Sequence, residues 1–208
     1  PKPALDKRAQ SGMLGELIVL ERLIKLKPKD ASKILKCWRS PFGNDDLHDF
    51  QFDNGHIEAK CSTKAPRSIS IGNLNQMNPD KAAKKKLFLV VVNLSKGEDL
   101  NLPIQVEKVR KLCKNNGCSA DFHTLLVKYK YSEIHELLYA QRNFTIVDDN
   151  NVEQIVILKV EDNTPIHTSK SFKENHKYDV EISQSVSVDN LGMKLMVDED
   201  WKILSNLV

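Results

Sequence analysis

The sequence has no long hydrophobic run. Its longest apolar stretch, Leu87–Val92, contains six residues, whereas a helix needs about 20 to span a membrane. The first ten residues, Pro1–Gln10, contain no apolar stretch of the kind that forms the centre of a secretory signal peptide. We therefore expect a cytoplasmic protein with no membrane partner. The absence of an initiator Met fits either processing before Pro1 or a piece of a longer chain.

The sequence also lacks a cysteine motif and a strong excess of one charge. Cys37, Cys61, Cys113 and Cys118 form no CxxC pair and no zinc-ligand cluster, which favours reduced thiols. The net charge of +3 is too small to indicate a nucleic-acid partner by itself. With 208 residues, of which 40% are hydrophobic and 28% charged, the chain fits a single domain over 1–208 and excludes wholesale disorder.

The hydrophobic periodicity predicts an α/β protein. Gly12–Ile24 is expected to form an amphipathic helix with Ser11 as its N-cap. Asn54-Gly55 separates two runs of alternating polarity, 48–53 and 56–61, and predicts a β-hairpin. The remaining expected elements are a short helix within Pro28–Lys36, a strand at Ser68–Ile71, a helix over Asn73–Lys84, a buried central strand at Leu87–Leu94, a loop at Gly97–Pro103, helices at Ile104–Asn115, Ser119–Tyr129 and Ser132–Tyr139, a polar loop at Glu161–Lys177, and strands at Asn143–Val147, Gln154–Val160 and Tyr178–Val188.

A two-residue turn at Asn54-Gly55 predicts the pairing of the hairpin. It would set Asp49 opposite Lys60. A three-residue turn would mix apolar and polar residues on both faces, so we expect the two-residue turn or a longer loop of equal parity. One face would then be apolar, and the other would carry Asp49, Gln51, Glu58 and Lys60.

Asp49 and Glu58 are diagonal neighbours in this pairing, ~7–8 Å apart at their Cα atoms. Two converging carboxylates suit Mg²⁺, which takes one or two carboxylates together with water and phosphate oxygens. Lys60, on the same face, could stabilise the attacking hydroxide or the charge that develops on a phosphate. The alternative is an ordinary solvated sheet face with a cross-strand Asp49–Lys60 pair.

A further carboxylate lies in the first predicted helix. Glu16 falls inside the apolar arc of that helix, between Leu20 and Leu23. A carboxylate there is costly unless it is paired, bound to metal or at the edge of a cleft. Gly12 and Gly15 flank it and would allow close approach of another backbone. The alternative is a rim position beside a lysine.

These residues resemble a known family. Glu16 in a first helix, Asp49 on a strand and Glu58-Ala59-Lys60 on the next strand resemble the PD-(D/E)XK nuclease superfamily. The motif's proline is absent, because His48 precedes Asp49, but it is the motif's most dispensable part. The wider context is similar to bacterial proteins described as "putative PD-(D/E)XK family member", which are often found beside restriction and phage-defence genes. That context comprises Gly15-Glu16-Leu17, Trp38-Arg39, His48-Asp49-Phe50, Glu58-Ala59-Lys60, Gln76-Met77 and Leu87–Val92.

The resemblance implies a restriction-endonuclease-like αβββαβ core over about 11–94 and a C-terminal extension over about 103–208. Those proteins tend to be longer at the N-terminus, so the chain would correspond to their C-terminal nuclease domain. The implied metal ligands, for Mg²⁺ or Mn²⁺, are Asp49, Glu58 and the backbone carbonyl of Ala59. Lys60 would position or activate water, Glu16 would support a second metal or orient Lys60, and Gln76 would give polar support.

The expected function is metal-dependent cleavage of double-stranded DNA in restriction or mobile-element defence, by a homodimer or with other defence proteins. The rival is a catalytically silent DNA-binding or assembly subunit, and RNA is a lesser candidate substrate. Arg39, Lys64 and Arg67 are candidate phosphate contacts, as are Lys84 and Lys85, although the basic cluster at 81–86 could equally be a solvated lysine face.

Two further alternatives concern residues around the hairpin. Asp45 and Asp46 could substitute for Asp49, but they are expected in a loop. His56 shares the face of Glu58 by parity and could act as a base, although a surface histidine near a turn is the commoner case.

Overall fold

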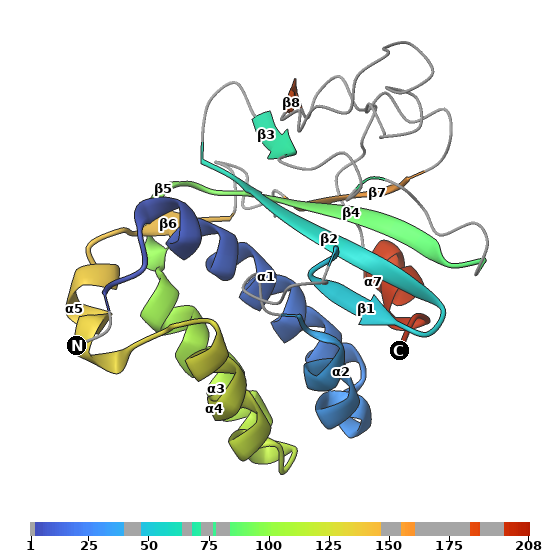
Figure 1. The fold of residues 1–208 in the computed structure, drawn as a ribbon, viewed down its shortest axis with the longest axis horizontal. Helices are drawn as coiled ribbons and strands as arrows, with labels where there is room; N and C mark the ends of the chain where they lie inside the picture. Colours follow the sequence, from blue (N-terminus) through green and yellow to red (C-terminus); the bar gives the residue numbers. More distant parts are fainter. Residues whose placement is uncertain are drawn as a thin grey trace.

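The computed structural model is built around a mixed β-sheet and describes residues 3–39, 47–63, 68–71, 77, 84–146, 155–160, 184–187 and 198–208 (Figure 1). The order and type of the elements confirm the α/β, restriction-endonuclease-like fold class. The elements are α1 (Lys7–Leu26), the 3-10 turn η1 (Pro28–Asp30), α2 (Ala31–Cys37), β1 (Phe50–Phe52), β2 (Gly55–Ser62), β3 (Ser68–Ile71), β4 (Lys86–Asn93), β5 (Ser95–Leu100), α3 (Leu102–Asn115), α4 (Ser119–Lys128), the 3-10 turn η3 (Glu133–His135), α5 (Glu136–Tyr139), β6 (Phe144–Thr145), β7 (Ile155–Lys159), β8 (Gln184–Ser187) and α7 (Asp198–Ser205).

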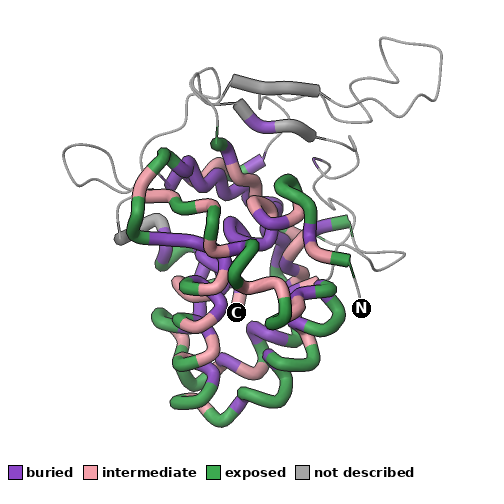
Figure 2. The backbone as a smooth tube through the Cα atoms, turned by 90° about the vertical axis from the view of Figure 1, so that its left-hand side faces the viewer, coloured by how far each residue is buried: buried purple, intermediate pink, exposed green. Residues whose placement is uncertain are grey.

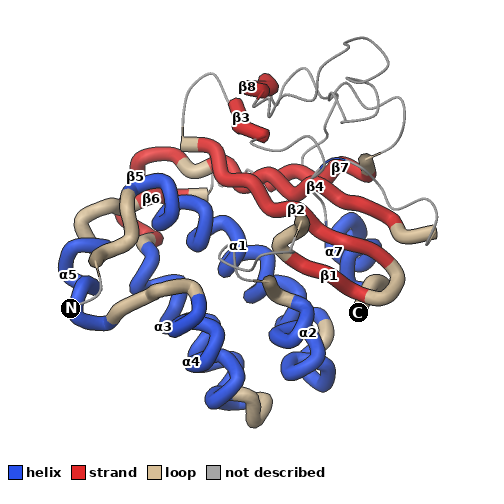
Figure 3. The backbone as a smooth tube through the Cα atoms, in the orientation of Figure 1, coloured by secondary structure: helices blue, strands red, loops and turns tan. Residues whose placement is uncertain are grey.

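Helix α1 lies between the sheet and the α3–α4 pair (Figure 3). It begins five residues earlier than predicted because Asp6, not Ser11, is the N-cap: the Asp6 side chain accepts a hydrogen bond from the Ala9 N–H at 2.8 Å. The Ser11 hydroxyl instead donates to the Lys7 carbonyl within the helix. The first turn is polar and carries no apolar periodicity, so the sequence pattern could not reveal it.

The main sheet has the strand order β1-β2-β4-β7. Strands β1 and β2 are antiparallel, β2 and β4 are parallel, and β4 and β7 are antiparallel. Strand β4 therefore has partners on both edges and is buried from Leu87 to Asn93, which confirms the predicted central strand. A parallel pair needs a crossover connection, and residues 63–85 provide it between β2 and β4.

The two faces of this sheet are covered differently. Phe50, Ile57, Phe88 and Val90 belong to the larger apolar core, which also includes residues of α1, α3 and α7. The opposite face carries a second apolar cluster of Leu87, Leu89 and Val91 of β4 with Ile69, Met77, Val156 and Val160. Figure 2 shows buried positions gathered inside the molecule and exposed positions along the outer turns of the helices. Both faces of the central strand are thus withdrawn from water.

Strand β3 spans the predicted residues but does not join the main sheet as the αβββαβ order implies. It pairs antiparallel with β8, with Ile69 opposite Val186, in a separate two-stranded sheet. Strand β2 is already paired with β4 along its whole length. The pattern predicted only the strand itself, because alternation reveals a strand but not its partner; its place in the core was implied by the resemblance. The helix predicted over Asn73–Lys84 and the loop at Glu161–Lys177 lie largely or wholly outside the described residues.

The predicted helices of the C-terminal extension are confirmed as α3, α4 and the short η3–α5 segment. Gly117 ends α3 in the left-handed conformation, with φ of 71°. The loop predicted at Gly97–Pro103 is wrong over its first part, because Ser95–Leu100 forms β5 and pairs with β6. This strand is mostly exposed and polar, so it lacks the alternation that marks a strand.

Helix α7 was not predicted at all. Its Trp201 and Leu204, together with Leu207 just beyond it, are at most 5% exposed and belong to the main core. Three apolar positions in a short segment give too little periodicity to distinguish a helix from a strand. The C-terminus therefore closes the core over α1.

Candidate functional site

The hairpin turn is formed by Asp53 and Asn54, one residue earlier than predicted. Phe50 lies opposite Ile57, and Phe52 lies opposite Gly55. The predicted pairs are therefore wrong by two residues, but the parity is unchanged. Phe50 and Glu58 lie on opposite faces, as the sequence predicts.

Gly55 explains the shift of the turn. A Cβ at this position would lie 2.6 Å from the carbonyl oxygen of Lys86 and 3.0 Å from Leu207 Cδ2. Gly55 is the first residue of β2 and pairs with Lys86 of β4. Its glycine is therefore required by the close approach of a neighbouring strand, not by the turn.

The observed pairing brings Asp49 and Glu58 closer together than the predicted diagonal arrangement would. Continued by one residue beyond β1, it sets Asp49 opposite Glu58 rather than Lys60. Asp49 Oδ2 accepts a hydrogen bond from the Ala59 N–H at 2.7 Å. The Asp49 side chain thus bonds to the β2 backbone one residue before β1 begins.

Glu58 is fully buried and makes an ion pair with Lys60, which is two residues further along β2. Glu58 Oε1 accepts from Lys60 Nζ. Glu58 Oε2 is buried and has no hydrogen-bond partner among the residues that the structure describes. An unpartnered buried carboxylate oxygen is costly, so this atom is the clearest position for a bound cation.

The electrostatics of the cluster formed by Asp49, Glu58 and Lys60 favour an additional positive charge. Burial and the Asp49 charge raise the pKa of Glu58 to about 8, against the opposing effects of Lys60 and of the Asp49 backbone N–H. Burial also raises the pKa of Asp49, although Lys60 and the Ala59 N–H lower it. Burial lowers the pKa of Lys60, but the Glu58 and Asp49 charges outweigh that effect and raise it, so the ammonium group stays protonated. A single lysine does not neutralise these carboxylates.

Glu16 belongs to the same cluster. Its side chain is 6% exposed, and Oε2 accepts from Trp38 Nε1 at 2.8 Å and lies 2.6 Å from the Tyr129 hydroxyl. Burial and the charge of Asp49 raise the Glu16 pKa well above its ordinary value. The carboxyl group therefore lies within electrostatic reach of Asp49.

Sequence reasoning missed both partners of Glu16. Tyr129 continues the helical apolar spacing of Phe122, Leu125 and Leu126, which indicates only a core position, and Trp38 enters only through the family resemblance. The Tyr129 hydroxyl also donates to the Arg39 carbonyl. One hydroxyl proton cannot be given to two oxygens, so both contacts are satisfied when Glu16 carries a proton.

Trp38 and Arg39 extend the sheet beyond β1 and beside Asp49. Trp38 bridges to Phe50 in antiparallel fashion, and the Arg39 N–H donates to the Asp49 carbonyl at 2.8 Å. Arg39, a predicted phosphate contact, is half-buried next to the carboxylate cluster. Among the basic candidates in the described part of the chain, Arg39 is the one whose backbone bonds to Asp49.

The other predicted basic contacts lie elsewhere or are not described. Lys84 lines a cavity of about 460 Å³ at the hairpin turn, formed with Lys86, Asp53, Asn54, Phe88, Ile203, Asn206 and Leu207. Lys85, which lies between Lys84 and Lys86 in the sequence, is half-buried. Lys64, Arg67 and Gln76 lie outside the described residues, as do Asp45 and Asp46.

His48 and His56 are buried, which corrects the expectation of surface histidines near a turn. Their rings stack with centroids 4.9 Å apart and an interplanar angle of 3°. The stacking places His48 next to His56, which shares the Glu58 face of β2 by parity.

The donors at this site fit a hard divalent ion. Asp49 and Glu58 offer carboxylate oxygens, the ligand type that Mg²⁺ prefers, and Mg²⁺ commonly keeps water for its remaining positions. Within the described ranges no group of three or more His, Cys, Asp or Glu side chains is arranged to hold a metal. The fit therefore rests on two carboxylates and the unpartnered Glu58 Oε2.

The fold and the site define an α/β protein with two carboxylates and a lysine on and beside neighbouring strands. Asp49, Glu58 and Lys60 follow one another in the order of a restriction-endonuclease-like motif. A family model described as "Putative PD-(D/E)XK family member" matches residues 1–174, most of the chain. The chain belongs to this family, and the resemblance drawn from its sequence is confirmed. A search of curated proteins and a search of solved structures find no match.

Helix α7 lies beyond the residues that the family model matches, yet its side chains complete the core. None of the helices in the described part of the chain is both long enough and apolar enough to cross a membrane.

Proposed function

We propose that this chain is a metal-dependent endonuclease that hydrolyses phosphodiester bonds in double-stranded DNA. The observation that carries the proposal is the convergence of the Asp49 and Glu58 carboxylates with the protonated Lys60 amine. A site with two carboxylates and one ammonium group suits phosphate chemistry, where charge develops on oxygen atoms. Membership of a PD-(D/E)XK family supports the same assignment.

Asp49 and Glu58 would hold Mg²⁺, for which Mn²⁺ would substitute, together with the backbone carbonyl of Ala59. When bound, the ion would supply Lewis acidity and lower the pKa of its water. The hydrogen bond from the Ala59 N–H fixes the Asp49 carboxylate in position.

Lys60 would act as a donor rather than a base. Before a metal binds, the neighbouring carboxylates raise its pKa and favour the ammonium form, which donates hydrogen bonds and cannot accept a proton. Its side chain is 19% exposed, whereas that of Glu58 is 1% exposed. The Nζ atom would orient the attacking water and stabilise charge on the phosphate oxygens. Glu16 would orient Lys60 or support a second metal, and Gln76 would add polar support.

Double-stranded DNA is the proposed partner. Arg39 beside Asp49 would contact a phosphate, and Lys64, Arg67, Lys84 and Lys85 would contact others. Such contacts position the duplex without reading its sequence. We further propose that residues 1–208 act as one domain in the cytoplasm, as a homodimer or with other restriction or defence proteins. The shared core from Leu5 to Leu207 supports the single domain.

Plasmid nicking tests this function. Purified protein is incubated with supercoiled plasmid in Mg²⁺ or Mn²⁺, with and without chelator, beside a gel-shift assay at fixed salt and a single-stranded RNA substrate. We expect nicked and linear DNA only with free metal. If the protein shifts DNA but never cuts it with either ion, the proposal of a DNA-binding subunit replaces that of an endonuclease. Cleavage of RNA but not of DNA would make RNA the substrate in place of DNA.

A further inference from the structure

Tyr129, at the end of α4, lies within the candidate site although it belongs to the C-terminal extension. It is 2% exposed, and its ring stacks on Trp38 with centroids 4.2 Å apart and an interplanar angle of 25°. Its hydroxyl lies 2.6 Å from Glu16 Oε2 and also donates to the Arg39 carbonyl. One side chain thus contacts three residues from the first 39 positions of the chain.

A continuous series of hydrogen bonds runs from this hydroxyl to the proposed metal ligands. The Arg39 carbonyl accepts from Tyr129, and the Arg39 N–H donates to the Asp49 carbonyl at 2.8 Å. The Asp49 carboxylate in turn accepts from the Ala59 N–H at 2.7 Å. Asp49 precedes β1, so no regular strand pairing within β1 fixes it. Its placement depends on the contacts that Arg39 and Ala59 make with it.

We propose that Tyr129 is a positioning residue of the Asp49–Glu58–Lys60 site. Its hydroxyl holds the carbonyl of Arg39, and the N–H on the other side of the Arg39 Cα holds the Asp49 carbonyl. The inference rests on the proposed function, because it assigns Tyr129 a role toward the ion that Asp49 would bind. It also gives the C-terminal extension a role in the site: α4, which packs against α3 (Figure 1), contacts α2 and brings the Tyr129 hydroxyl to the site from that extension.

Packing alone does not account for the hydroxyl. The stacking on Trp38 and the burial of the ring would be kept by phenylalanine, which lacks only the oxygen atom. The hydroxyl instead satisfies a buried carboxyl and a backbone carbonyl, and the loss of such a partner leaves a buried polar group unsatisfied. Residues that hold metal ligands through hydrogen bonds commonly change metal affinity when they are altered.

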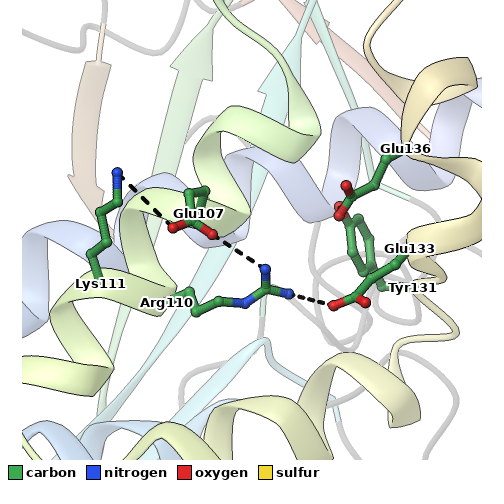
Figure 4. A network of polar contacts seen from close by, with 6 residues as sticks. All are labelled: Glu107, Arg110, Lys111, Tyr131, Glu133 and Glu136. Atoms are coloured by element: carbon green, nitrogen blue, oxygen red, sulfur yellow. Dashed lines mark hydrogen bonds and ion pairs between the residues drawn. The ribbon is translucent and has the colours of Figure 1, made fainter.

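The test is the substitution Tyr129→Phe with Mn²⁺ titrated calorimetrically into the full chain in the absence of DNA. We expect the Mn²⁺ dissociation constant to rise about tenfold or more, whereas the gel-shift affinity for DNA without metal changes less than about twofold. Tyr131→Phe is the matched control. Tyr131 is also a buried tyrosine, and its hydroxyl donates to Glu136 at 2.8 Å beside the Arg110–Glu133 pair (Figure 4). That variant should bind Mn²⁺ as the wild type does.

A second variant separates positioning from a general loss of structure. Tyr129→4-aminophenylalanine restores a donor on the same ring and should recover most of the Mn²⁺ affinity. If Tyr129→Phe fails to fold, the Mn²⁺ affinity of the 4-aminophenylalanine variant, compared with that of wild type, decides whether Tyr129 has the positioning role. Wild-type Mn²⁺ affinity in Tyr129→Phe, or no recovery with the restored donor, would overturn the positioning role. A wild type that binds no Mn²⁺ would overturn it as well.

The proposed nuclease function can fail separately. If the wild type binds Mn²⁺ but cuts neither plasmid nor RNA, the endonuclease proposal is wrong, and the Mn²⁺ titrations still decide whether Tyr129 positions the site. If the wild type cuts DNA and Tyr129→Phe binds Mn²⁺ and cuts equally well, only the positioning role is wrong.

Discussion

The Asp49 carboxylate accepts a hydrogen bond from the backbone N–H of Ala59, at 2.7 Å between Oδ2 and N. This contact fastens the residue before β1 to the middle of β2. Ala59 lies between Glu58 and Lys60, so the same short segment of backbone orients all three charged side chains. The arrangement depends on the hairpin register, which in turn depends on how closely β2 approaches β4.

Gly55→Ala tests that close approach. The new Cβ would lie 2.6 Å from the Lys86 carbonyl oxygen, which is backbone and cannot swing aside. We expect a loss of about 1–3 kcal/mol in the free energy of unfolding, measured by urea denaturation.

Gly12→Ala is the control for this substitution. It lies inside α1, and nothing lies within 4 Å of its added Cβ. Alanine is the better helix former, so this variant should gain about 0.8–1 kcal/mol. Equal stability of Gly55→Ala and wild type would contradict the contact between β2 and β4.

The faces of the hairpin were predictable, but its turn was not. Parity alone assigns Phe50 and Glu58 to opposite faces, because any shift by two residues preserves it. Asn54-Gly55 has the composition of a hairpin turn, yet Gly55 is needed for contact with Lys86 on a distant strand. Local sequence cannot report a clash with a residue that far away.

The candidate carboxylates were predictable because each violates a local pattern or belongs to a motif. Glu16 interrupts an apolar arc, which marks it as unusual. Its partner Tyr129 was not predictable, because 113 positions separate the two and Tyr129 continues an ordinary apolar stripe. Long-range pairing of polar groups leaves no periodic signal in the sequence.

Leu204→Ala tests whether α7 completes the core. Leu204 is fully buried, so its truncation should cost about 2–5 kcal/mol. Ile203, its neighbour on the same helix, is 50% exposed, and Ile203→Ala should cost much less. Thermal or urea unfolding of both variants measures the difference. Similar stabilities for the two would mean that α7 does not pack as described.

Lys60→Ala tests the donor role of the lysine. Asp49 and Glu58 remain, so Mn²⁺ binding should persist, but the charge on the phosphate loses its partner. By analogy with the loss of an oxyanion donor, we expect the cleavage rate constant to fall about 10²–10³-fold, measured by plasmid nicking at saturating metal.

Lys25→Ala is the control for the lost charge. Lys25 is exposed and pairs with the half-buried Glu21 one turn earlier in α1, and a pair with one exposed partner contributes about 0–1 kcal/mol. Its removal should leave cleavage unchanged. A Lys60→Ala variant that cuts at the wild-type rate would exclude Lys60 from the reaction.

The central claim is tested most directly by plasmid cleavage with Asp49→Asn, compared with wild type and with Asp53→Asn in the exposed hairpin turn. Asparagine retains an oxygen that can accept from the Ala59 N–H, so the fold should survive while the metal loses a charged ligand. The account predicts that Asp49→Asn loses cleavage in Mg²⁺ but keeps the metal-free gel-shift of wild type, and that Asp53→Asn keeps both. Cleavage by Asp49→Asn at the wild-type rate would contradict the account and would make Asp45 and Asp46 the next candidates.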